Sequence, residues 1–479
     1  MSEDNLKSKT KKSLYWQFFN QFGNTGLQFV ITTILARLLT PEDYGITALP
    51  VIFLAVSQCI VESGFGAALI RKPDLNEKDL STAFYYGVCM GIILYLGLFL
   101  ASPFIADFYD APILTSVLKV TALGLLLSPV ASVLSVQLTR SLEFKVLAKI
   151  SLTCRITTGF VALVIAFSGY GIWALVVPQV VGSFLNIFLL YYCVRWRPKE
   201  HWSKESFKYL WGFGSKLLFS YLLGTIYENI YVVVIGKFYS PVQLGIWNRA
   251  QSYANLPSKQ ATGVLQSVTF PVLSKIQDDE EKLAFNYRRI LRVSAFVVFP
   301  IMLLLSALAE QFVVILITDK WIECVPFLQI MCVAMMLYPI HAINLNVLQV
   351  KGRSDLFLRL EIIKKIMGVA ILCVTIPWGL IPMAWGMMVS SILSFFVNTY
   401  YTGKLIHVNC WRQTLDIAPI FGMAGLMYFV TGFISSCFAN VYVQVVIGGA
   451  VAVVLYLGIA VLLKREELND LKYMLKRKS

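Results

Sequence analysis

Long apolar runs follow one another along the whole chain, separated by short polar connections. Each run is close to the roughly 20 residues that an α-helix needs to cross the hydrocarbon core of a bilayer. The pattern therefore predicts an all-α polytopic membrane protein with about 14 transmembrane helices. The predicted spans are residues 14–39, 44–70, 83–108, 117–138, 146–168, 172–194, 209–238, 242–272, 293–309, 325–350, 360–378, 381–406, 417–437 and 441–463.

One predicted span, residues 242–272, carries a continuous polar face. Its polar positions are spaced 4, 3, 4, 3 and 4 residues apart, which is the repeat of one side of a helix. They are Asn248, Ser252, Asn255, Lys259, Thr262 and Gln266. Lys259 lies 18 residues after Pro241, about 27 Å along a helix and too deep for its ammonium group to reach the membrane surface.

A cation at the bilayer centre costs about 2.5–3.5 kcal/mol, so such a side chain turns toward protein or trapped water. The polar face therefore predicts one wall of a wet, cationic cavity, bordered by Arg249. The alternative is that these side chains tie neighbouring helices together, each contributing about 0.6–2 kcal/mol. Arg249 is the weaker candidate, because at about 12 Å from the end of the span its guanidinium group can still reach the headgroups.

The first span repeats this arrangement. Gln17, Gln21, Asn24 and Gln28 are spaced 4, 3 and 4 residues apart and form a second polar stripe on one helical face. Two such stripes in distant spans predict a shared cavity.

A comparison of the chain with itself shows a weak internal repeat. Leu39-Thr40-Pro41 followed by Gly45-Ile46 recurs as Tyr239-Ser240-Pro241 followed by Gly245-Ile246, at an offset of 200 residues. Six predicted spans separate the two copies, an even number, so both halves begin on the same side of the membrane. Parallel repeats of this kind place a substrate site between the halves near the midplane.

Three further ionisable residues inside predicted spans are candidates for function. Glu228 either takes up a proton or ion during transport or pairs with Arg249 or Lys237, and Glu62 is a second ion-coupling candidate. Arg155 either lines the inner half of the cavity or pairs with a neighbouring side chain.

The distribution of charge gives the orientation. The net charge is +14 and the mean hydropathy is +0.70. Most basic residues fall in alternate connections, whereas the opposite connections contain only Arg37, Lys237 and Lys320. This alternation is the positive-inside pattern, which predicts that both termini lie in the cytoplasm and argues against a nucleic-acid partner.

Several classes of chemistry lack their usual motifs. The chain has no phosphate-binding G-x-x-x-x-G-K-[ST] sequence, and neither its three histidines nor its nine cysteines form a metal-ligand pattern. The acidic run Asp278-Asp279-Glu280-Glu281 is more typical of a solvated turn and helix start than of a metal site. We therefore expect no cofactor, no metal and no enzymatic activity.

The sequence resembles the bacterial polysaccharide transporter family of lipid-linked oligosaccharide flippases, in the colanic acid exporter branch. This family belongs to the superfamily that also contains multidrug and toxin extruders. The matching segments are Leu35-Ala36-Arg37 with Tyr44-Gly45, Gly64 through Lys72, Phe270-Pro271 with Lys275 through Asp279 and Glu281 through Leu283, and Lys320-Trp321 with Pro326 and Leu328-Gln329. The resemblance implies a V-shaped pair of pseudo-symmetric six-helix bundles, two added C-terminal helices and a cationic central cavity.

The resemblance also implies the function. We expect a flippase or exporter that moves undecaprenyl-diphosphate-linked oligosaccharide repeat units across the bacterial cytoplasmic (inner) membrane by alternating access, for surface polysaccharide assembly. Membrane lipids and polysaccharide polymerase or assembly proteins are the expected further partners. Expected substrate contacts are Arg249, Lys259, Asn255, Ser252, Asn248, Asn24, Gln28 and Arg155. The alternatives are a cation-coupled multidrug extruder and, more distantly, a membrane-embedded glycosyl or acyl transferase.

The predicted division of the chain follows the repeat. Residues 1–194 form an N-terminal six-helix bundle, 195–208 a cytoplasmic linker and 209–406 a second six-helix bundle. Residues 407–463 add two transmembrane helices, and residues 464–479 form a cytoplasmic tail.

Overall fold

The computed structural model describes residues 3–470, and its side chains are described for residue 16 and from residue 20 onward except residue 268. The side chain of Gln17 and residues 471–479 of the predicted tail therefore lie outside the described part of the chain. Helices joined by turns and short loops make up residues 3–470, without a β-strand, as the apolar runs predict.

The chain divides into two compact units, Met1–Gly245 and Ile246–Ser479. Unit 1 contains α1 (Glu3–Leu38), α2 (Pro41–Ala48), α3 (Val51–Glu62), α4 (Phe65–Arg71), α5 (Glu77–Phe108), α6 (Leu114–Thr121), α7 (Leu123–Arg140), α8 (Phe144–Phe167), α9 (Trp173–Val194) and α10 (Lys204–Phe238). The helix α11 (Pro241–Ser274) starts in unit 1 and continues into unit 2.

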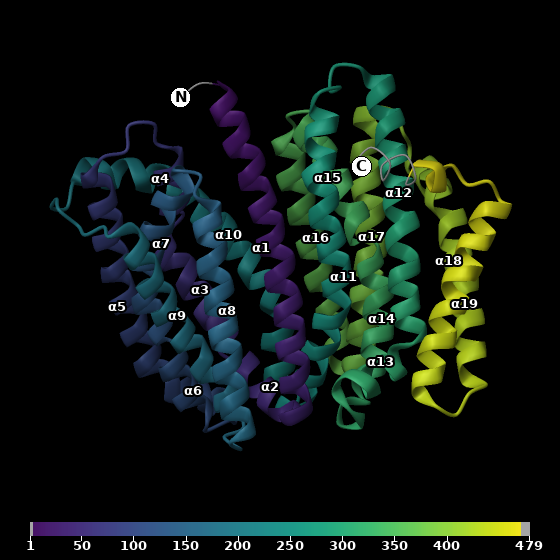
Figure 1. Ribbon diagram of the computed structural model, residues 1–479, viewed down its shortest axis with the longest axis horizontal. Coiled ribbons are helices and arrows are strands. Elements are labelled where there is room, and N and C mark those ends of the chain that lie inside the picture. Colours follow the sequence, from purple (N-terminus) through teal and green to yellow (C-terminus); the bar gives the residue numbers. More distant parts are fainter. Residues whose placement is uncertain (1–2, 471–479) are drawn as a thin grey trace. The chain divides into compact units, whose positions relative to one another are not determined.

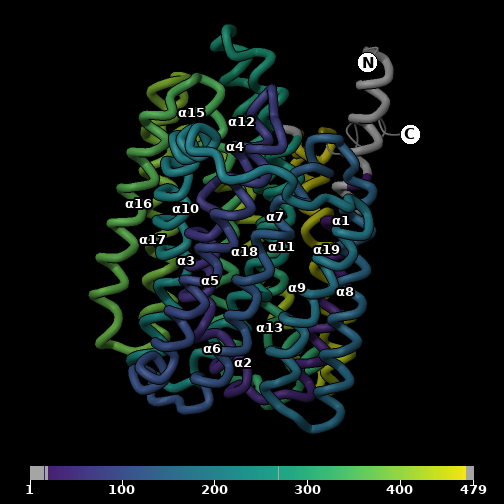
Figure 2. The backbone as a smooth tube through the Cα atoms, turned by 90° about the vertical axis from the view of Figure 1, so that its left-hand side faces the viewer, coloured from purple at the N-terminus to yellow at the C-terminus, as the bar shows by residue number. Residues whose placement is uncertain are grey.

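Unit 2 contains the remaining helices. They are α12 (Glu280–Ala307), α13 (Ala309–Ile317), α14 (Cys324–Met336), α15 (Tyr338–Val350), α16 (Ser354–Thr375), α17 (Leu380–Ile406), α18 (Cys410–Ser436) and α19 (Val441–Leu462), with short 3₁₀ turns at Asp319–Trp321 and Ile376–Trp378. Figure 1 labels these elements, and Figure 2 shows the same backbone from the side.

Eleven helices, some of them built from consecutive short elements, are long and apolar enough to cross a membrane within the described residues. Three more long helices, α1, α11 and α16, coincide with predicted spans but fall outside this set. Polar stripes lower the hydropathy of α1 and α11, and α16 carries Arg359, Glu361, Lys364 and Lys365. The count of fourteen transmembrane helices therefore stays a prediction.

Helix packing in unit 1 brings distant segments together. The helix α1 lies along α8, α8 packs on α9, and α5 packs on α7 (Figures 1 and 2). The helix α10, which the repeat assigns to the second bundle, packs on α3, α4 and α5. The packing of the helices therefore divides the chain after Gly245, whereas the internal repeat divides it at residues 195–208. The domain boundaries derived from the repeat remain a prediction.

The two copies of the repeat begin helices with the same cap. The Thr40 hydroxyl accepts a hydrogen bond from the Asp43 amide, and the Asp43 carboxylate accepts one from the Thr40 amide. Ser240 and Gln243 exchange the same pair of bonds at the start of α11. Both satisfy amide groups that the first helical turn leaves without a partner.

The two capped helix starts cross each other at glycines. A Cβ atom on Gly45 would overlap the carbonyl oxygen of Pro241, and one on Gly245 would overlap the carbonyl oxygen of Pro41. Each copy thus places its glycine against the proline of the other, as in a contact with local two-fold symmetry. The glycines are required because the backbones approach too closely for any side chain.

Candidate functional site

Unit 1 contains a large polar cavity between α1, α3, α7, α8 and α9. Its volume is about 860 Å³. Among the described residues, Glu62 is the only charged one in its lining. The polar residues that share the lining are Asn20, Gln58, Thr121, Ser128, Ser132, Ser135, Ser151, Gln179, Ser183 and Asn186. Hydroxyl and amide groups both donate and accept hydrogen bonds, so this lining matches the hydroxyl-rich surface of a sugar.

A second cavity of about 640 Å³ adjoins the first, between α1, α8 and α9. The two share Ser151, Gln179, Ser183 and Asn186 as lining residues. Gln28 of the predicted stripe lines this second cavity, and Arg155 is the only charged residue among the described side chains of its lining. Adjacent cavities of unit 1 thus carry opposite charges.

Arg155 lies well inside α8. It is 11 residues after Phe144, where the helix begins, which corresponds to about 16 Å along the axis. Among the described side chains no carboxylate lies within ion-pair distance of its guanidinium group, and the residue is half-buried. The alternative of a neighbouring acidic partner therefore has no support in unit 1, and the charge is available to an anionic ligand.

Asn24 and Gln28 of the same stripe behave differently. The Asn24 amide donates to the Ser151 hydroxyl at 2.9 Å and to the carbonyl oxygen of Asn20 at 2.9 Å. It thereby ties α1 to α8, which is the helix-joining role, and it lines neither cavity. Gln28 is exposed and faces the second cavity.

The two candidate ion-coupling residues lie in different surroundings. Glu62 is exposed to the larger cavity and accepts a hydrogen bond of 2.5 Å from Gln58. Glu228 is exposed on α10 and lines neither cavity. Lys237, which the sequence offered as a partner of Glu228, contacts Phe108. Its ammonium group donates to the Phe108 carbonyl oxygen at 2.6 Å and lies over the Phe108 ring.

In unit 2, Arg249 is packed among aromatic rings. Only 6% of its surface is exposed, and its guanidinium carbon lies 5.6 Å from the centre of the Tyr253 ring and 5.5 Å from that of Trp321. Stacking of this kind stabilises a cation away from water. Arg249 therefore lies on the buried side of α11.

The rest of the α11 stripe is divided between two environments. Lys259, Ser252 and Gln266 are exposed, and Asn248 and Asn255 are half-buried. Ser258 and Thr262 are buried, and the Ser258 hydroxyl bonds the Met335 carbonyl oxygen at 2.7 Å, which joins α11 to α14. The predicted cavity between the two halves remains a prediction.

Two further polar stripes line the larger cavity and were not among the predicted site residues. Ser128, Ser132 and Ser135 on α7 are spaced 4 and 3 residues apart, as are Gln179, Ser183 and Asn186 on α9. This is the same periodic signal that identified the stripes of α1 and α11. The spacing is present in the sequence. It does not by itself indicate a cavity, because small uncharged side chains are common between packed transmembrane helices.

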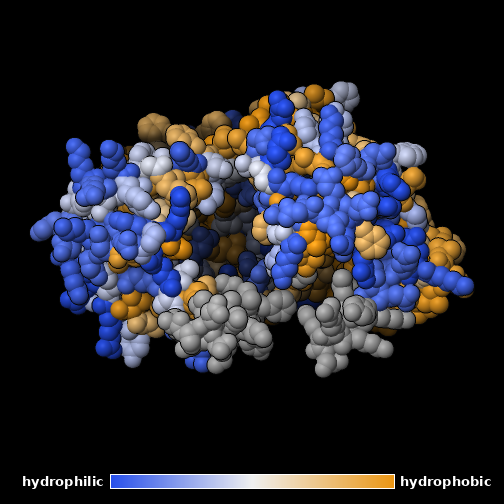
Figure 3. All heavy atoms as spheres, turned by 90° about the horizontal axis from the view of Figure 1, so that it is seen from above, coloured by the Kyte–Doolittle hydropathy of each residue, from blue (hydrophilic) through white to orange (hydrophobic). Residues whose placement is uncertain are grey.

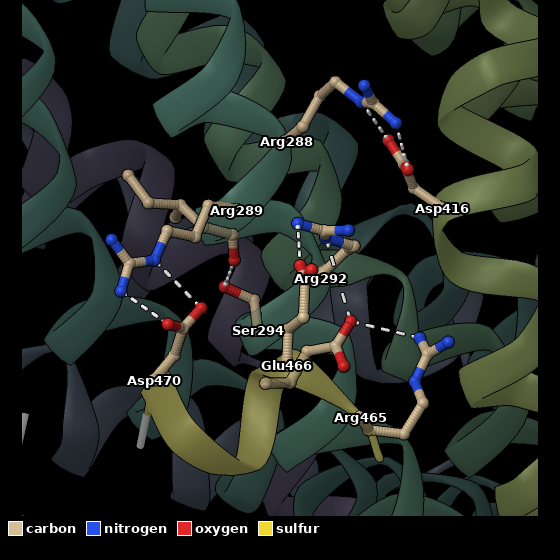
Figure 4. Close-up of polar contacts among 10 residues, drawn as sticks. Arg288, Arg289, Arg292, Ser294, Asp416, Arg465, Glu466 and Asp470 are labelled. Carbon is tan, nitrogen blue, oxygen red and sulfur yellow. Dashed lines mark hydrogen bonds and ion pairs between the residues drawn. The ribbon is translucent and has the colours of Figure 1, made fainter. Parts of the chain in front are cut away.

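The basic residues of α12 have structural partners. Arg288 forms two hydrogen bonds with Asp416 of α18, at 2.7 and 2.6 Å (Figure 4). Arg289 pairs with Asp470, and Arg292 pairs with Glu466. These pairs fasten α18 and the segment after α19 to α12.

The acidic run before α12 starts a helix. The Asp279 carboxylate caps α12 by accepting the Lys282 amide at 3.0 Å, which confirms the predicted helix start. A side-chain hydrogen bond from Lys282 lowers the pKa of Asp279. Within the described residues, no group of three or more His, Cys, Asp or Glu side chains is arranged to hold a metal ion.

The long apolar helices of the two units form an all-α fold of the membrane-protein type, and polar cavities lie inside unit 1. The chain resembles the inward-closed structure of the lipid II flippase MurJ with a TM-score of 0.74, at 15% identity over 95% of this chain and 99% of that one. An inward-facing multidrug resistance MATE family transporter matches with a TM-score of 0.54, at 14% identity over 81% of this chain and 95% of that one.

The sequence belongs to the polysaccharide biosynthesis protein family, whose model matches residues 34–326. Among its relatives, the lipopolysaccharide biosynthesis protein WzxC of Escherichia coli (strain K12) is 26% identical over 85% of this chain and 84% of that protein. The teichuronic acid biosynthesis protein TuaB of Bacillus subtilis (strain 168) is 25% identical over 82% of both chains. The succinoglycan biosynthesis transport protein ExoT of Rhizobium meliloti (strain 1021) is 24% identical over 69% of this chain and 67% of that protein.

Proposed function

We propose that this protein is a flippase that moves a polyprenyl-diphosphate-linked oligosaccharide across the bacterial inner membrane for surface polysaccharide assembly. Its relatives carry names from polysaccharide biosynthesis and transport, and the matching fold includes a protein named as a lipid II flippase. The observation that carries the proposal is the pair of adjoining polar cavities in unit 1. One of them contains Arg155, which has no carboxylate within ion-pair distance among the described side chains.

In this mechanism the hydroxyl- and amide-lined cavity binds the glycan, and Arg155 binds an anionic group of the substrate. A charged hydrogen bond in a site of low dielectric constant is stronger than in water, so one arginine offsets part of the desolvation of a phosphate or carboxylate. Lys259, an exposed cation on the part of α11 that belongs to unit 2, is a second candidate for binding an anionic group. The polyprenyl chain remains in the lipid, and alternating access transfers the headgroup between the two membrane surfaces.

The coupling ion belongs to the same proposal. Glu62 lines the larger cavity and can exchange a proton or cation with water there, whereas Glu228 is the second candidate on α10. The basic ends of the helices face the cytoplasm, and polysaccharide polymerase or assembly proteins receive the flipped unit. The protein itself performs no catalytic step.

Translocation of a polyprenyl-diphosphate oligosaccharide in reconstituted vesicles tests the proposal. We expect Arg155→Ala to reduce the initial rate at limiting substrate about tenfold, the loss of one charge-assisted hydrogen bond, and Lys259→Ala to reduce it as well. Lys149→Ala, an exposed change on the same helix that lines neither cavity, is the matched control. Full activity of the Arg155 variant would remove this residue from the mechanism.

The same vesicles distinguish the other candidates. Glu62→Gln should abolish the response of the rate to an imposed proton or cation gradient while leaving downhill exchange of substrate. Transport of a cationic drug in place of the lipid would instead identify a multidrug extruder.

A further inference from the structure

A third cavity lies at the basic end of unit 1, where the loop before α5 meets the start of α10. Its volume is about 540 Å³, and its lining includes Lys72, Lys78, Lys208, Glu205 and Tyr209. None of its lining residues belongs to the two cavities proposed for the glycan. The cavity therefore needs a separate explanation.

Hydrogen bonds fix the walls of this cavity. Both oxygens of the fully buried Asp79 accept from Lys72 at 2.7 Å, and the Asp79 amide donates to Asn76 at 3.0 Å. On the other side, the Ser203 amide donates to the Thr82 hydroxyl at 3.1 Å, which holds the linker before α10 against α5. The two lysine-bearing segments are thus held at a defined separation.

The charges in this cavity sum to one positive charge. Lys72 is neutralised by Asp79. Lys78 and Lys208 are exposed, and among the described side chains neither has a carboxylate within ion-pair distance, while Glu205 contributes one negative charge to the lining. A phosphate diester carries one negative charge and matches this balance.

Aromatic side chains place the cavity at the membrane surface. Trp202, Tyr209 and Trp211 are 47%, 43% and 38% exposed, and tryptophan and tyrosine favour the depth of the lipid headgroups. Phe207 packs between the two tryptophans, with ring centres 5.0 Å from Trp202 and 5.8 Å from Trp211.

An apolar surface leads away from the cavity toward the membrane core. Phe219 and Leu223 lie 11 and 15 residues after Lys208, which places them on the same side of α10, and both are largely exposed. A phosphate held by Lys78 and Lys208 would therefore have its acyl chain lying along this side of α10.

We infer that this cavity binds the phosphate group of an acidic membrane lipid, with Lys78 and Lys208 as the recognising cations and the exposed face of α10 as the track for its chain. Near a membrane surface each lysine contributes about fivefold to the affinity for an anionic lipid. The inference requires no transport activity and stands independently of the proposed function.

Native mass spectrometry of the full chain, exchanged with equal amounts of phosphatidylglycerol and phosphatidylcholine, tests it. The wild type should retain phosphatidylglycerol in preference to phosphatidylcholine. Lys78→Gln and Lys208→Gln should each lower that retention about fivefold, and the double variant about 25-fold. Lys149→Gln removes the same charge from another exposed position of unit 1 and should change nothing, and thermal melting confirms that all variants fold.

Three outcomes would overturn the assignment. The double variant retains phosphatidylglycerol as well as Lys149→Gln does, the wild type retains both lipids equally, or millimolar inorganic phosphate displaces the lipid. The last result would make free phosphate the ligand.

Discussion

Arg155 and Glu62 place opposite charges in the polar interior of unit 1. They lie in adjoining cavities that share four lining residues, and in the described part of the chain each is the only charged side chain of its cavity. Charges inside a membrane protein are retained where water or a ligand solvates them. If the proposed function is correct, opposite charges in neighbouring cavities would allow a substrate anion and a coupling cation to affect one another over a short distance.

Asn24 and Gln28 give a residue-scale prediction, because they share a stripe but differ in their contacts. Asn24→Ala removes the bond to Ser151 and should lower thermal stability by about 0.6–2 kcal/mol with little change in substrate affinity. Gln28→Ala should leave stability unchanged and weaken substrate binding. Melting in detergent and the translocation assay measure the two effects, and an unchanged melting temperature for Asn24→Ala would contradict its joining role.

At the scale of helices, α2 and α11 begin in the two copies of the repeat and cross each other in an approximately symmetric contact. Two equivalent caps start the two helices, and two equivalent glycines allow their backbones to touch. The helix α11 starts at this crossing in unit 1 and continues into unit 2.

Gly45→Ala and Gly245→Ala should each displace the start of α11, because the added methyl group meets a backbone carbonyl that cannot rotate away. We expect a loss of stability of at least about 1–3 kcal/mol, as for other overpacking changes. Gly26→Ala and Gly224→Ala are the controls, since nothing lies within 4 Å of a Cβ at either position. Equal melting temperatures for all four variants would contradict the close crossing.

A second prediction at the scale of helices concerns the ion pair that attaches α18 to α12. Asp416→Asn leaves the Arg288 guanidinium without its charged partner in a mostly buried site and should cost about 1–3 kcal/mol. The exposed pair of Arg353 and Asp355 provides the control, because solvent screens this pair and Asp355→Asn should therefore lower stability much less than Asp416→Asn. Chemical or thermal unfolding compares the two, and equal costs would show that burial of the first pair does not matter.

At the scale of the whole molecule, the distribution of basic residues predicts the orientation in the membrane. Figure 3 looks onto the ends of the helices and shows hydrophilic residues gathered over this face of each unit. In unit 1 this end carries Arg71, Lys72, Lys78 and Arg140, and in unit 2 it carries Arg288, Arg289 and Arg292. Membrane proteins retain such ends in the cytoplasm.

The predicted orientation can be measured with single cysteines in a background whose nine native cysteines are replaced. Cysteines at Lys78 and Lys282 should react with a membrane-impermeant maleimide only after the cells are opened. Cysteines at Glu42 and Val242, at the opposite end, should react in intact cells. The reverse pattern would contradict the cytoplasmic placement of the termini.

The sequence by itself determined the class of the fold and the polar helix faces. Apolar runs predict helices because the bilayer leaves no other partner for the backbone, and a spacing of 3 and 4 residues defines a helix face whatever lies opposite. These local rules identified the stripes of α1 and α11, the repeat at Pro41 and Pro241, and the helix start at Asp279.

Only the tertiary structure decided what each polar side chain meets. Asn24 binds Ser151 at 127 residues' distance in the chain, Arg249 is covered by Trp321, and α10 packs on α3, α4 and α5. The serine and amide stripes of α7 and α9 became a cavity lining only when those helices were placed beside α1 and α8. A helix face records its own polarity, but whether it faces a ligand or another helix depends on neighbours that are distant in the sequence, and their positions are fixed by packing.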